Sequence, residues 1–408
     1  MGEYAIEERL DWRRWVTPKL LSGRPVHRWY VFPHSYTSEL VDELIDEWGL
    51  GCQDVVLDPF SGAGTTLLAA KESGVSASGY DLSPLAVLVA RAKVADYDIE
   101  ELETAWAALR VRIDPSEWQG GGNECSPLIR RALPGRLLSA FRNIDRNIAA
   151  LPATRTVQSF LRLALLGLIP HYSRAAATGG WLKWVKNGKR SSSLLNSLER
   201  RVRMMMRDIP RTPSRVEGAW DVERADARCL PGADDRFTAV ITSPPYPNRH
   251  DYTRVFGVEL MLGFLDYAGT RDLRFQSFHS HPEARPTRPR AEGYSQPREL
   301  AEAVERIRGR GGDSRVPRMV EGYFLDTFLA LQEVKRLCRP NSRIGWVVGN
   351  AQYRGVSVPV DELTAEIGEQ LGLQCEKVLV ARYRGNSAQQ MGRYGRQPSR
   401  ESVVVFRA

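Results

Sequence analysis

The feature that most constrains the fold is a glycine-rich loop near residue 60, which connects a short apolar segment to a helical one. Residues 55–58, Val-Val-Leu-Asp, are apolar up to a final aspartate, which is typical of a strand buried in a parallel sheet. The loop PFSGAGTT (59–66) follows, then a helical segment at 67–74 and a second strand-like segment, SASGYD, at 76–81. Strand, loop, helix and strand in this order form a βαβ unit. This unit predicts an α/β fold with a doubly wound, mostly parallel sheet.

Other segments extend the same pattern. Residues 37–49 repeat apolar side chains at helical spacing between a Thr-Ser start and a closing glycine, which predicts a helix. Strand-like runs return at 237–242 (FTAVIT) and 343–350 (RIGWVVGN). The last two runs, at 375–383 and 401–408, flank a loop rich in Gly and Arg. They predict an antiparallel hairpin at the edge of the sheet.

The glycine loop has the properties of a ligand site. Its Gly-Ala-Gly spacing allows a tight turn and a close approach of the backbone to a ligand at the start of a helix. No Gly-Lys-Ser/Thr follows, so a phosphate-binding P-loop is not expected. Asp81 ends the second strand about twenty residues after the loop, where an acid accepts hydrogen bonds from ribose hydroxyls. The alternative for Asp81 is a cap at the start of the next helix, SPLAVLVARA.

A second motif, Ser243-Pro244-Pro245-Tyr246, directly follows the strand at 237–242. Two consecutive prolines fix the backbone and supply carbonyl groups but no N–H groups, which makes a rigid turn rich in acceptors. Such a turn suits an amino group that donates both hydrogens while its nitrogen attacks an electrophile. Tyr246 offers a flat face for an extruded base. The alternative is an ordinary Pro-Pro turn with a surface tyrosine.

Taken together, DPFSGAGTT and TSPPY resemble the S-adenosylmethionine-dependent DNA methyltransferases that methylate exocyclic amines. The serine form of the second motif is similar to the cytosine-N4 branch, whereas adenine-N6 enzymes more often have Asp or Asn in that place. The resemblance implies a Rossmann-like class I methyltransferase fold, with a seven-stranded sheet and an antiparallel C-terminal hairpin. Many cytosine-N4 enzymes carry the motifs in the opposite order, so adenine-N6 methylation stays open as the alternative.

The resemblance also implies roles for individual residues. The loop at Asp58 is expected to hold the methionine part of the cofactor, Asp81 the ribose and Asp226 the adenine amino group, with His34 and Ser35 capping the site. The cofactor-binding residues implied are His34, Ser35, Asp58, Pro59, Phe60, Ser61, Gly62, Gly64, Thr65, Thr66, Asp81, Leu82, Asp226 and Ala227. The catalytic residues implied are Ser243, Pro244, Pro245 and Tyr246. His250 and Asp251 either accept the released proton or orient the loop.

Two stretches interrupt the catalytic domain. Residues 100–215 show helical periodicity with many Arg and no clear strands, and we expect a helical insertion that binds DNA. Residues 268–318 are rich in Arg and Pro, and are either a target-recognition element or a flexible loop. The catalytic domain is thus expected to be discontinuous, with its N-terminal cofactor-binding part at 1–99 and the rest at 216–408.

The charge of the chain is compatible with a polyanionic partner. Lys and Arg number 57 and Asp and Glu 49, a net charge of +8, and most of the cations are Arg. Codon bias explains the Arg surplus equally well. Aromatic and cationic residues alternate in WLKWVKNGKR (181–190), which indicates either DNA contacts or an amphipathic helix with buried tryptophans. The candidate DNA-binding residues are Trp181, Lys183, Lys186, Lys189, Arg190, Arg249, Arg393 and Arg396, together with Arg400.

Other classes of protein are disfavoured. The five cysteines have no metal-ligand spacing and no zinc-deaminase signature occurs, so we expect no metal. No run approaches eighteen apolar residues and no signal-peptide core is present, which predicts a cytoplasmic prokaryotic protein that is associated with the nucleoid when on DNA.

The function expected is transfer of a methyl group from S-adenosylmethionine to the N4 amine of cytosine in double-stranded DNA, after base flipping. The alternatives are adenine-N6 methylation, methylation of an RNA base amine, and a nucleic-acid-binding scaffold that retains a relict cofactor fold. The recognition sequence, the oligomeric state and the link to a restriction–modification system stay open.

Overall fold

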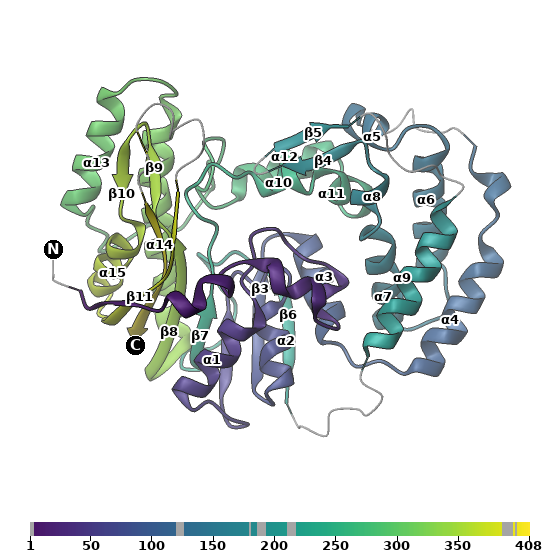
Figure 1. Cartoon of the computed structure of the whole chain (residues 1–408), viewed down its shortest axis with the longest axis horizontal. Coiled ribbons are helices and arrows are strands. Elements are labelled where there is room, and N and C mark those ends of the chain that lie inside the picture. Colours follow the sequence, from purple (N-terminus) through teal and green to yellow (C-terminus); the bar gives the residue numbers. More distant parts are fainter. Residues whose placement is uncertain are drawn as a thin grey trace.

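The central sheet is mixed, and its strands come from both ends of the chain (Figure 1). The structure, a computed structural model, describes residues 4–119, 126–178, 181–185, 193–209, 218–385, 395 and 398–408. Within these ranges the sheet has the order β1-β11-β12-β8-β7-β2-β3-β6. Its strands are β1 (Ile6–Glu8), β2 (Val55–Asp58), β3 (Ser76–Asp81), β6 (Trp220–Arg224), β7 (Phe237–Thr242), β8 (Cys338–Gly349), β11 (Gln374–Arg384) and β12 (Ser399–Arg407).

The strands of the described sheet run parallel except for β12. β2 pairs in parallel with β3 and β7, β3 with β6, and β7 with β8. β12 lies antiparallel between β8 and β11. The α/β class, the parallel βαβ unit and the antiparallel C-terminal hairpin are therefore confirmed. The hairpin joins the sheet through β12, its second strand.

Two strands of the sheet were not predicted, β6 at one edge and β1 at the other. β1 pairs in parallel with β11, with Ile6 opposite Val378, and makes eight strands where the family resemblance implies seven. All three of its residues are exposed and two are glutamates, so it has neither an apolar run nor an alternating pattern. The strand forms because the edge of β11 offers unpaired backbone groups. The sequence of a strand that pairs with such an edge carries no signal of this pairing.

Side chains of the central strands alternate between two apolar cores, because successive residues of a strand point to opposite faces. Val56 and Ile241 belong to the core with α1 (Ser38–Trp48), α2 (Thr65–Glu72) and α3 (Pro84–Val94). Leu57 and Val240 belong to the other core, with α13 (Arg298–Gly309), α14 (Arg315–Leu337) and α15 (Val360–Gln370). Helices cover both faces, so the sheet is doubly wound as predicted.

Between α3 and β6 the chain leaves the sheet and forms a group of helices at one end of the molecule (Figure 1). Buried side chains of these helices, such as Phe160 and Leu198, belong to the same apolar core as α1–α3. The helices are α4 (Ile99–Arg112), α5 (Pro127–Ala132), α6 (Arg136–Ala149), α7 (Arg155–Leu166), α8 (Ile169–Tyr172) and α9 (Leu194–Asp208). Whether they form a separate domain with boundaries at 100 and 215 stays a prediction.

The same segment also contains a hairpin that the sequence did not reveal. β4 (Ala175–Thr178) pairs antiparallel with β5 (Trp181–Trp184). Residues 181–184 form a strand, so the amphipathic-helix alternative is wrong for them. Their contact with DNA stays a prediction. Strands of four residues are too short for their periodicity to separate them from helix.

The remaining elements connect these parts. After β7, the short helices α10 (Tyr252–Val255), α11 (Gly257–Gly263) and α12 (Tyr267–Gln276) extend towards the helical group (Figure 1). A loop and α13 then fill most of the predicted excursion at 268–318. The others are β9 (Ala351–Tyr353), β10 (Val356–Val358) and four 3-10 helices, η1 (Leu10–Arg14), η2 (Pro18–Gly23), η3 (His27–Trp29) and η4 (Pro115–Glu117). Among the described helices, none has the length and apolar composition needed to cross a membrane.

Candidate active site

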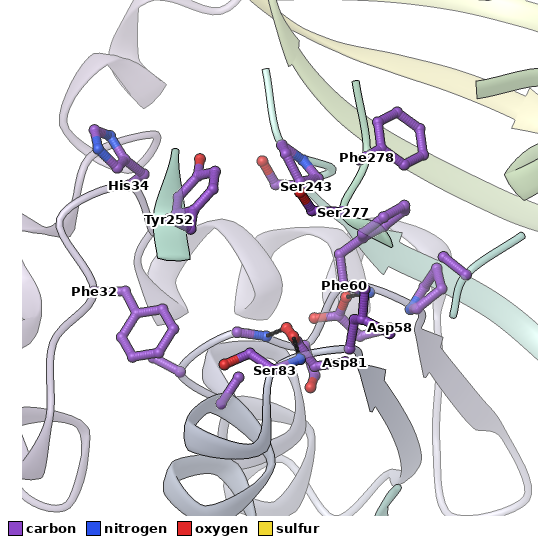
Figure 2. A pocket seen from close by; sticks show the side chains of 18 of the residues that line it. Phe32, His34, Asp58, Phe60, Asp81, Ser83, Ser243, Tyr252, Ser277 and Phe278 are labelled. Carbon is purple, nitrogen blue, oxygen red and sulfur yellow. Dashed lines mark hydrogen bonds between the residues drawn. The ribbon is translucent and has the colours of Figure 1, made fainter. Parts of the chain in front are cut away.

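A cavity opens at the carboxyl ends of four neighbouring parallel strands, β7, β2, β3 and β6. Asp58 ends β2, Asp81 ends β3 and Ser243 follows β7, and all three line the cavity. Asp226, two residues beyond β6, lines it as well. Figure 2 shows Asp81 and Ser83 at the bottom of the view, with Ser243 above them. In open α/β sheets, ligands bind at this edge.

Aromatic side chains from distant parts of the chain form the walls of this cavity. Phe32 and Tyr252 lie on one side, and Phe60 and Phe278 on the other (Figure 2). The ring centroids of Phe60 and Phe278 are 5.5 Å apart, and the rings meet edge to face. Phe32 lies 4.5 Å from Phe256. Of these five residues only Phe60 was predicted from the sequence, because an isolated aromatic residue outside a motif carries no signal of its position.

Asp58 connects β2 to β7 from inside the protein. Its side chain is buried and accepts hydrogen bonds from the hydroxyls of Thr66 at 2.7 Å and Thr242 at 2.6 Å. It also accepts one from the backbone N–H of Phe60 at 3.1 Å. Burial raises the pKa of Asp58, although these donors act in the opposite direction. The hydroxyl of Thr66 also contacts that of Tyr36, and Thr66 is not among the residues that line the cavity.

The two glycines of the loop have different tasks. Gly62 has φ of +48° and lines the cavity, and its N–H donates to Asp81 Oδ2 at 2.9 Å. Gly64 has φ of +72° and lies outside the lining; a Cβ there would be 2.8 Å from Cα and Cβ of Ala90 in α3. Gly62 thus brings the backbone to the cavity. Gly64 permits α2 and α3 to pack closely.

Asp81 presents a carboxylate to the cavity. Two backbone N–H groups bind it, that of Gly62 at 2.9 Å and that of Ser83 at 2.8 Å. Burial raises the pKa of Asp81 to about 6, against the effect of these two donors. The N-cap position of α3 is occupied by Ser83, two residues later. Asp81 is therefore not the cap of this helix, which was the alternative considered for it.

The Ser-Pro-Pro-Tyr turn contributes Ser243 and Pro245 to the cavity lining, while Pro244 is buried. Tyr246 is partly buried beside the cavity, where the guanidinium of Arg384 lies 5.8 Å from the centre of its ring. The pKa of Tyr246 is raised, chiefly by burial and further by the negative charge of the nearby Glu401. Ser243 and the glycine loop, which are about 180 positions apart in the sequence, thus share one cavity.

Comparison with known proteins finds relatives among the DNA methylases. Residues 13–91 match the model of the N6/N4 methyltransferase family, described as DNA methylase. Over 97% of its length the chain is 28% identical to Type II methyltransferase M.BsoBI of Geobacillus stearothermophilus, 88% of which is covered. It is 26% identical, also over 97% of its length, to Type II methyltransferase M.AvaI of Nostoc sp., 89% of which is covered.

The chain is similar to the DNA methylases of the N6/N4 class, and it matches two Type II methyltransferases over 97% of its length. A solved geranyl diphosphate methyltransferase in complex with GPP and sinefungin covers the whole chain at 9% identity. Its TM-score is 0.33, too low to support a common arrangement of the elements. The family assignment therefore rests on the sequence relatives and on the motifs.

As a DNA methylase of this class, the protein uses S-adenosylmethionine, and the cavity suits that cofactor. A carboxylate that is held by two backbone donors and has a raised pKa is stabilised by further donors, such as the two hydroxyls of a ribose. The apolar lining beside Asp81 includes Leu82, Ala86 and Phe60. The residues implied by the family resemblance that line the cavity are His34, Ser35, Asp58, Pro59, Phe60, Ser61, Gly62, Thr65, Asp81, Leu82, Asp226 and Ala227.

His250 and Asp251 lie between the Ser-Pro-Pro-Tyr turn and α10. The carboxylate of Asp251 caps α10 through the N–H of Arg254 at 3.1 Å, and it pairs with Arg274 at 2.8 Å. These contacts favour an orienting role for Asp251. The ring of His250 packs 4.5 Å from that of His34, and burial together with Arg384 lowers its pKa.

The candidate DNA-binding residues are mostly outside the described ranges, including Lys186, Lys189, Arg190, Arg393 and Arg396. Lys183 is exposed on β5, the strand that also includes Trp181. Arg249 is exposed three residues after Tyr246. Arg400, in contrast, is partly buried, and its guanidinium pairs with Asp361 at 3.0 Å and with Glu362. Those two acids already neutralise it.

Proposed function

We propose that this methylase transfers the methyl group of S-adenosylmethionine to the exocyclic N4 amine of cytosine in double-stranded DNA. The observation that carries the proposal is the common cavity of Gly62 and Ser243. One side of this cavity has the donors and acceptors of a nucleoside site. The other side has a proline-stiffened turn that is rich in acceptors.

The chemistry required of the protein is modest. Bound S-adenosylmethionine supplies a methyl group on a sulfonium, which is already a good leaving group. The chain must bring the amine nitrogen into line with that methyl carbon and keep water out. Transfer of that methyl to the amine would release S-adenosylhomocysteine and one proton of the amine, and the nitrogen would lose its conjugation with the ring. Hydrogen bonds from the amine to Ser243 and to the carbonyl of Pro244 strengthen at this point, so they lower the barrier.

The target base must leave the double helix to reach the cavity, because its amine is otherwise paired and stacked. We propose that Tyr246, whose ring centre lies 5.8 Å from the guanidinium of Arg384, supports the extruded cytosine. Lys183 and Arg249 are exposed cations that would contact the phosphates of the DNA. The candidates outside the described residues belong to the same proposal: Lys186, Lys189, Arg190, Arg393 and Arg396.

The relatives named above are Type II methyltransferases. We propose the same biological setting for this chain, methylation of host DNA at a specific sequence within a restriction–modification system in the cytoplasm. The similarity to these two relatives does not decide between cytosine and adenine. The serine of the Ser-Pro-Pro-Tyr turn supports cytosine.

The deciding experiment is in vitro methylation with labelled S-adenosylmethionine, followed by digestion of the DNA to nucleosides and mass spectrometry. The proposal expects N4-methylcytosine. N6-methyladenine would move the chain to the adenine branch, and cofactor binding without label transfer would support the scaffold alternative. Turnover on transfer RNA equal to that on double-stranded DNA would favour an RNA substrate.

A further inference from the structure

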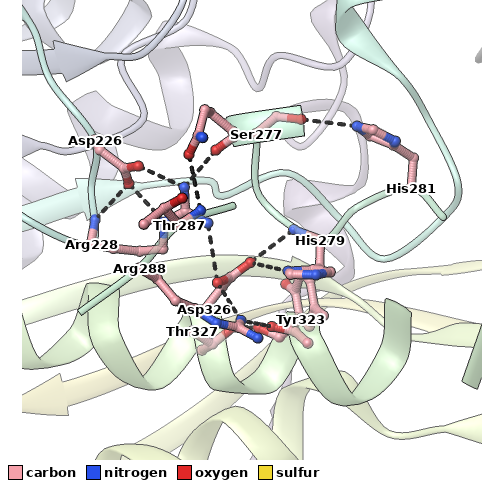
Figure 3. Close-up of polar contacts among 12 residues, drawn as sticks. Asp226, Arg228, Ser277, His279, His281, Thr287, Arg288, Tyr323, Asp326 and Thr327 are labelled. Atoms are coloured by element: carbon pink, nitrogen blue, oxygen red, sulfur yellow. Dashed lines mark hydrogen bonds and ion pairs between the residues drawn. The ribbon is translucent and has the colours of Figure 1, made fainter. Parts of the chain in front are cut away.

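A buried carboxylate in α14 holds together three separate parts of the chain (Figure 3). Asp326 is fully buried, and its Oδ2 accepts from Nδ1 of His279 at 2.7 Å and from the backbone N–H of the same residue at 2.9 Å. Its Oδ1 lies 2.8 Å from Arg288 and 3.1 Å from Arg228. His279 and Arg288 lie in the loop between α12 and α13, whereas Arg228 follows β6.

Arg228 extends this cluster to the cofactor side of the cavity. Its guanidinium donates hydrogen bonds to both carboxylate oxygens of Asp226, at 2.8 and 2.6 Å, and to the carbonyl of Gln276 at 2.6 Å. Asp226 and Arg228 both line the cavity. The orientation of Asp226, the residue implied to contact the cofactor adenine, is therefore set by Arg228. Arg228 is held in turn by Asp326.

The loop that Asp326 holds is itself a wall of the cavity. Ser277 and Phe278 line the cavity, and Phe278 packs on Phe60 of the glycine loop and on Tyr323 of α14, each at 5.5 Å between ring centroids. The loop also reaches the segment after Tyr246, because the carbonyl of Ser280 accepts from the N–H of Arg249 at 2.8 Å. It thus touches both the cofactor side and the target-base side.

Close packing fixes the loop on the helix. A Cβ at Gly322, one turn before Asp326, would lie 2.6 Å from the ring of His279. The imidazole therefore needs a glycine at this position to reach the carboxylate. The pKa of Asp326 is lowered: burial acts to raise it, but the hydrogen bond from His279 and the charges of Arg228 and Arg288 outweigh that effect.

We propose that Asp326 is a positioning residue that couples the adenine end of the cofactor site to the loop at 277–288 on the target-base side. Through Arg228 it orients Asp226, and through His279 and Arg288 it orders the loop. Because coupling between two sites is reciprocal, cofactor binding at Asp226 tightens the loop, and an ordered loop strengthens cofactor binding. The inference rests on the role proposed for Asp226.

The first test measures binding without catalysis, by calorimetry with S-adenosylhomocysteine. Asp326→Asn keeps the shape of the side chain but loses its charge, and we expect a loss of affinity of about tenfold, within the usual range of coupling between sites. Asp361→Asn is the matched control. Asp361, in α15, is also fully buried, and its carboxylate pairs with Arg400 and Ser402 of β12. It should lower the thermal stability of the protein and leave the affinity unchanged.

The second test follows the loop by hydrogen exchange. In the wild-type protein, S-adenosylhomocysteine should slow the amide exchange of residues 277–288. In Asp326→Asn that segment should exchange faster, and the cofactor analogue should no longer protect it. Arg288→Gln, which removes a partly exposed partner of Asp326, tests the same coupling if Asp326→Asn does not fold. It should speed the exchange of the loop and weaken the effect of the analogue.

The outcomes separate this inference from the proposed function. Wild-type affinity and wild-type loop protection in Asp326→Asn would overturn the coupling. If Asp226→Asn binds the analogue as tightly as the wild type, the adenine contact of Asp226 is wrong, and the coupling through it falls too. The identity of the methylated base is read independently by mass spectrometry of wild-type product, so cytosine-N4 methylation stands or fails separately.

Discussion

Ser243 and Asp81 face the same cavity from two strands, but we expect the two side chains to act at different stages of the reaction. Ser243 lies where the target amine would be held, and its hydrogen bond strengthens as the nitrogen leaves conjugation. Asp81 lies where a ribose would be held, and its hydrogen bonds are complete once the cofactor is bound. Kinetic and binding measurements on single variants separate these roles.

Ser243→Ala is expected to lower kcat by about a hundredfold, similar to the loss of a donor that stabilises charge in other transition states. The dissociation constant of S-adenosylmethionine should change less than about twofold. Steady-state kinetics with a DNA substrate and calorimetry with the cofactor provide the two values. Comparable losses in both would show that Ser243 acts in binding or folding rather than in the reaction.

The affinity for S-adenosylmethionine should depend on pH through Asp81. The pKa of this partly buried carboxyl is raised to about 6, and only the ionised form accepts hydrogen bonds from both ribose hydroxyls. Protonation below pH 6 therefore competes with binding, and affinity should fall up to about tenfold per pH unit there and level off above it. Asp81→Asn should bind more weakly and with little pH dependence between pH 5 and 7. A variant that retains the wild-type pH profile would assign the titration to another group.

At the scale of elements, the glycine loop joins two tasks that its sequence does not distinguish. Gly62 serves the ligand cavity, and Gly64 serves the packing of α2 against α3. The buried network of Asp58, Thr66 and Thr242 also has a structural task. It connects β2 to β7 and so sets the distance between the glycine loop and the Ser-Pro-Pro-Tyr turn. Substitutions at these positions should therefore affect stability first.

Gly64→Ala is expected to lower the free energy of unfolding by about 2–4 kcal/mol, because it combines a positive φ with a Cβ that overlaps Ala90. Gly49→Ala is the control. Gly49 has a similar φ of +67° with open space around its Cβ, so it should lose only about 1 kcal/mol for the backbone conformation. Denaturant unfolding measures both. Equal losses would mean that α2 and α3 adjust without cost.

At the scale of the whole molecule, polar contacts with the N-terminal segment help to fix the position of the helical group. Asp208, at the end of α9, is buried and accepts from Nε of Arg28 at 2.9 Å and from Nε1 of Trp29 at 3.1 Å. It also accepts from the N–H of Val26 at 3.3 Å. The group shares the apolar core of α1–α3, so its position relative to the cavity depends on this junction.

Asp208→Ala is expected to lower the free energy of unfolding by about 2–3 kcal/mol, because it leaves buried donors of Trp29 and Val26 without an acceptor. Glu199→Ala, on the same helix, removes ion pairs with the exposed Arg110 and Arg203 and should cost at most about 0.5 kcal/mol. Thermal unfolding compares the two. A small effect at Asp208 would show that the apolar core alone holds the group in place.

Lys183→Ala tests the proposed contact between the β4–β5 hairpin and DNA. If Lys183 neutralises one phosphate, affinity should weaken for all DNA sequences alike, and the slope of log affinity against log salt should fall by about one. Lys335→Ala is the control. Lys335 is exposed near the end of α14, next to the amino end of β8, whereas the cavity lies at the carboxyl ends of the parallel strands. Binding titrations at several salt concentrations separate the two. An unchanged slope in Lys183→Ala would remove this hairpin from the DNA surface.

The sequence alone determined the α/β class, the parallel βαβ unit, the C-terminal hairpin and the two motifs, because each is encoded by neighbouring residues through periodicity or turn chemistry. It did not reveal β1, β6 or β4–β5, which depend on a partner edge or are too short to show a period. The aromatic walls at Phe32, Tyr252 and Phe278 were likewise hidden.

Only the tertiary structure decided which side chains meet. Gly62 and Ser243 share a cavity because β2 and β7 are neighbours in the sheet, and Asp326 reaches Arg228 and His279 because α14 packs beneath both. Such contacts join residues that are far apart in the chain, and their energy comes from burial and from paired charges. The local sequence specifies neither the burial nor the pairing of these side chains, so their contacts became visible only in the folded chain.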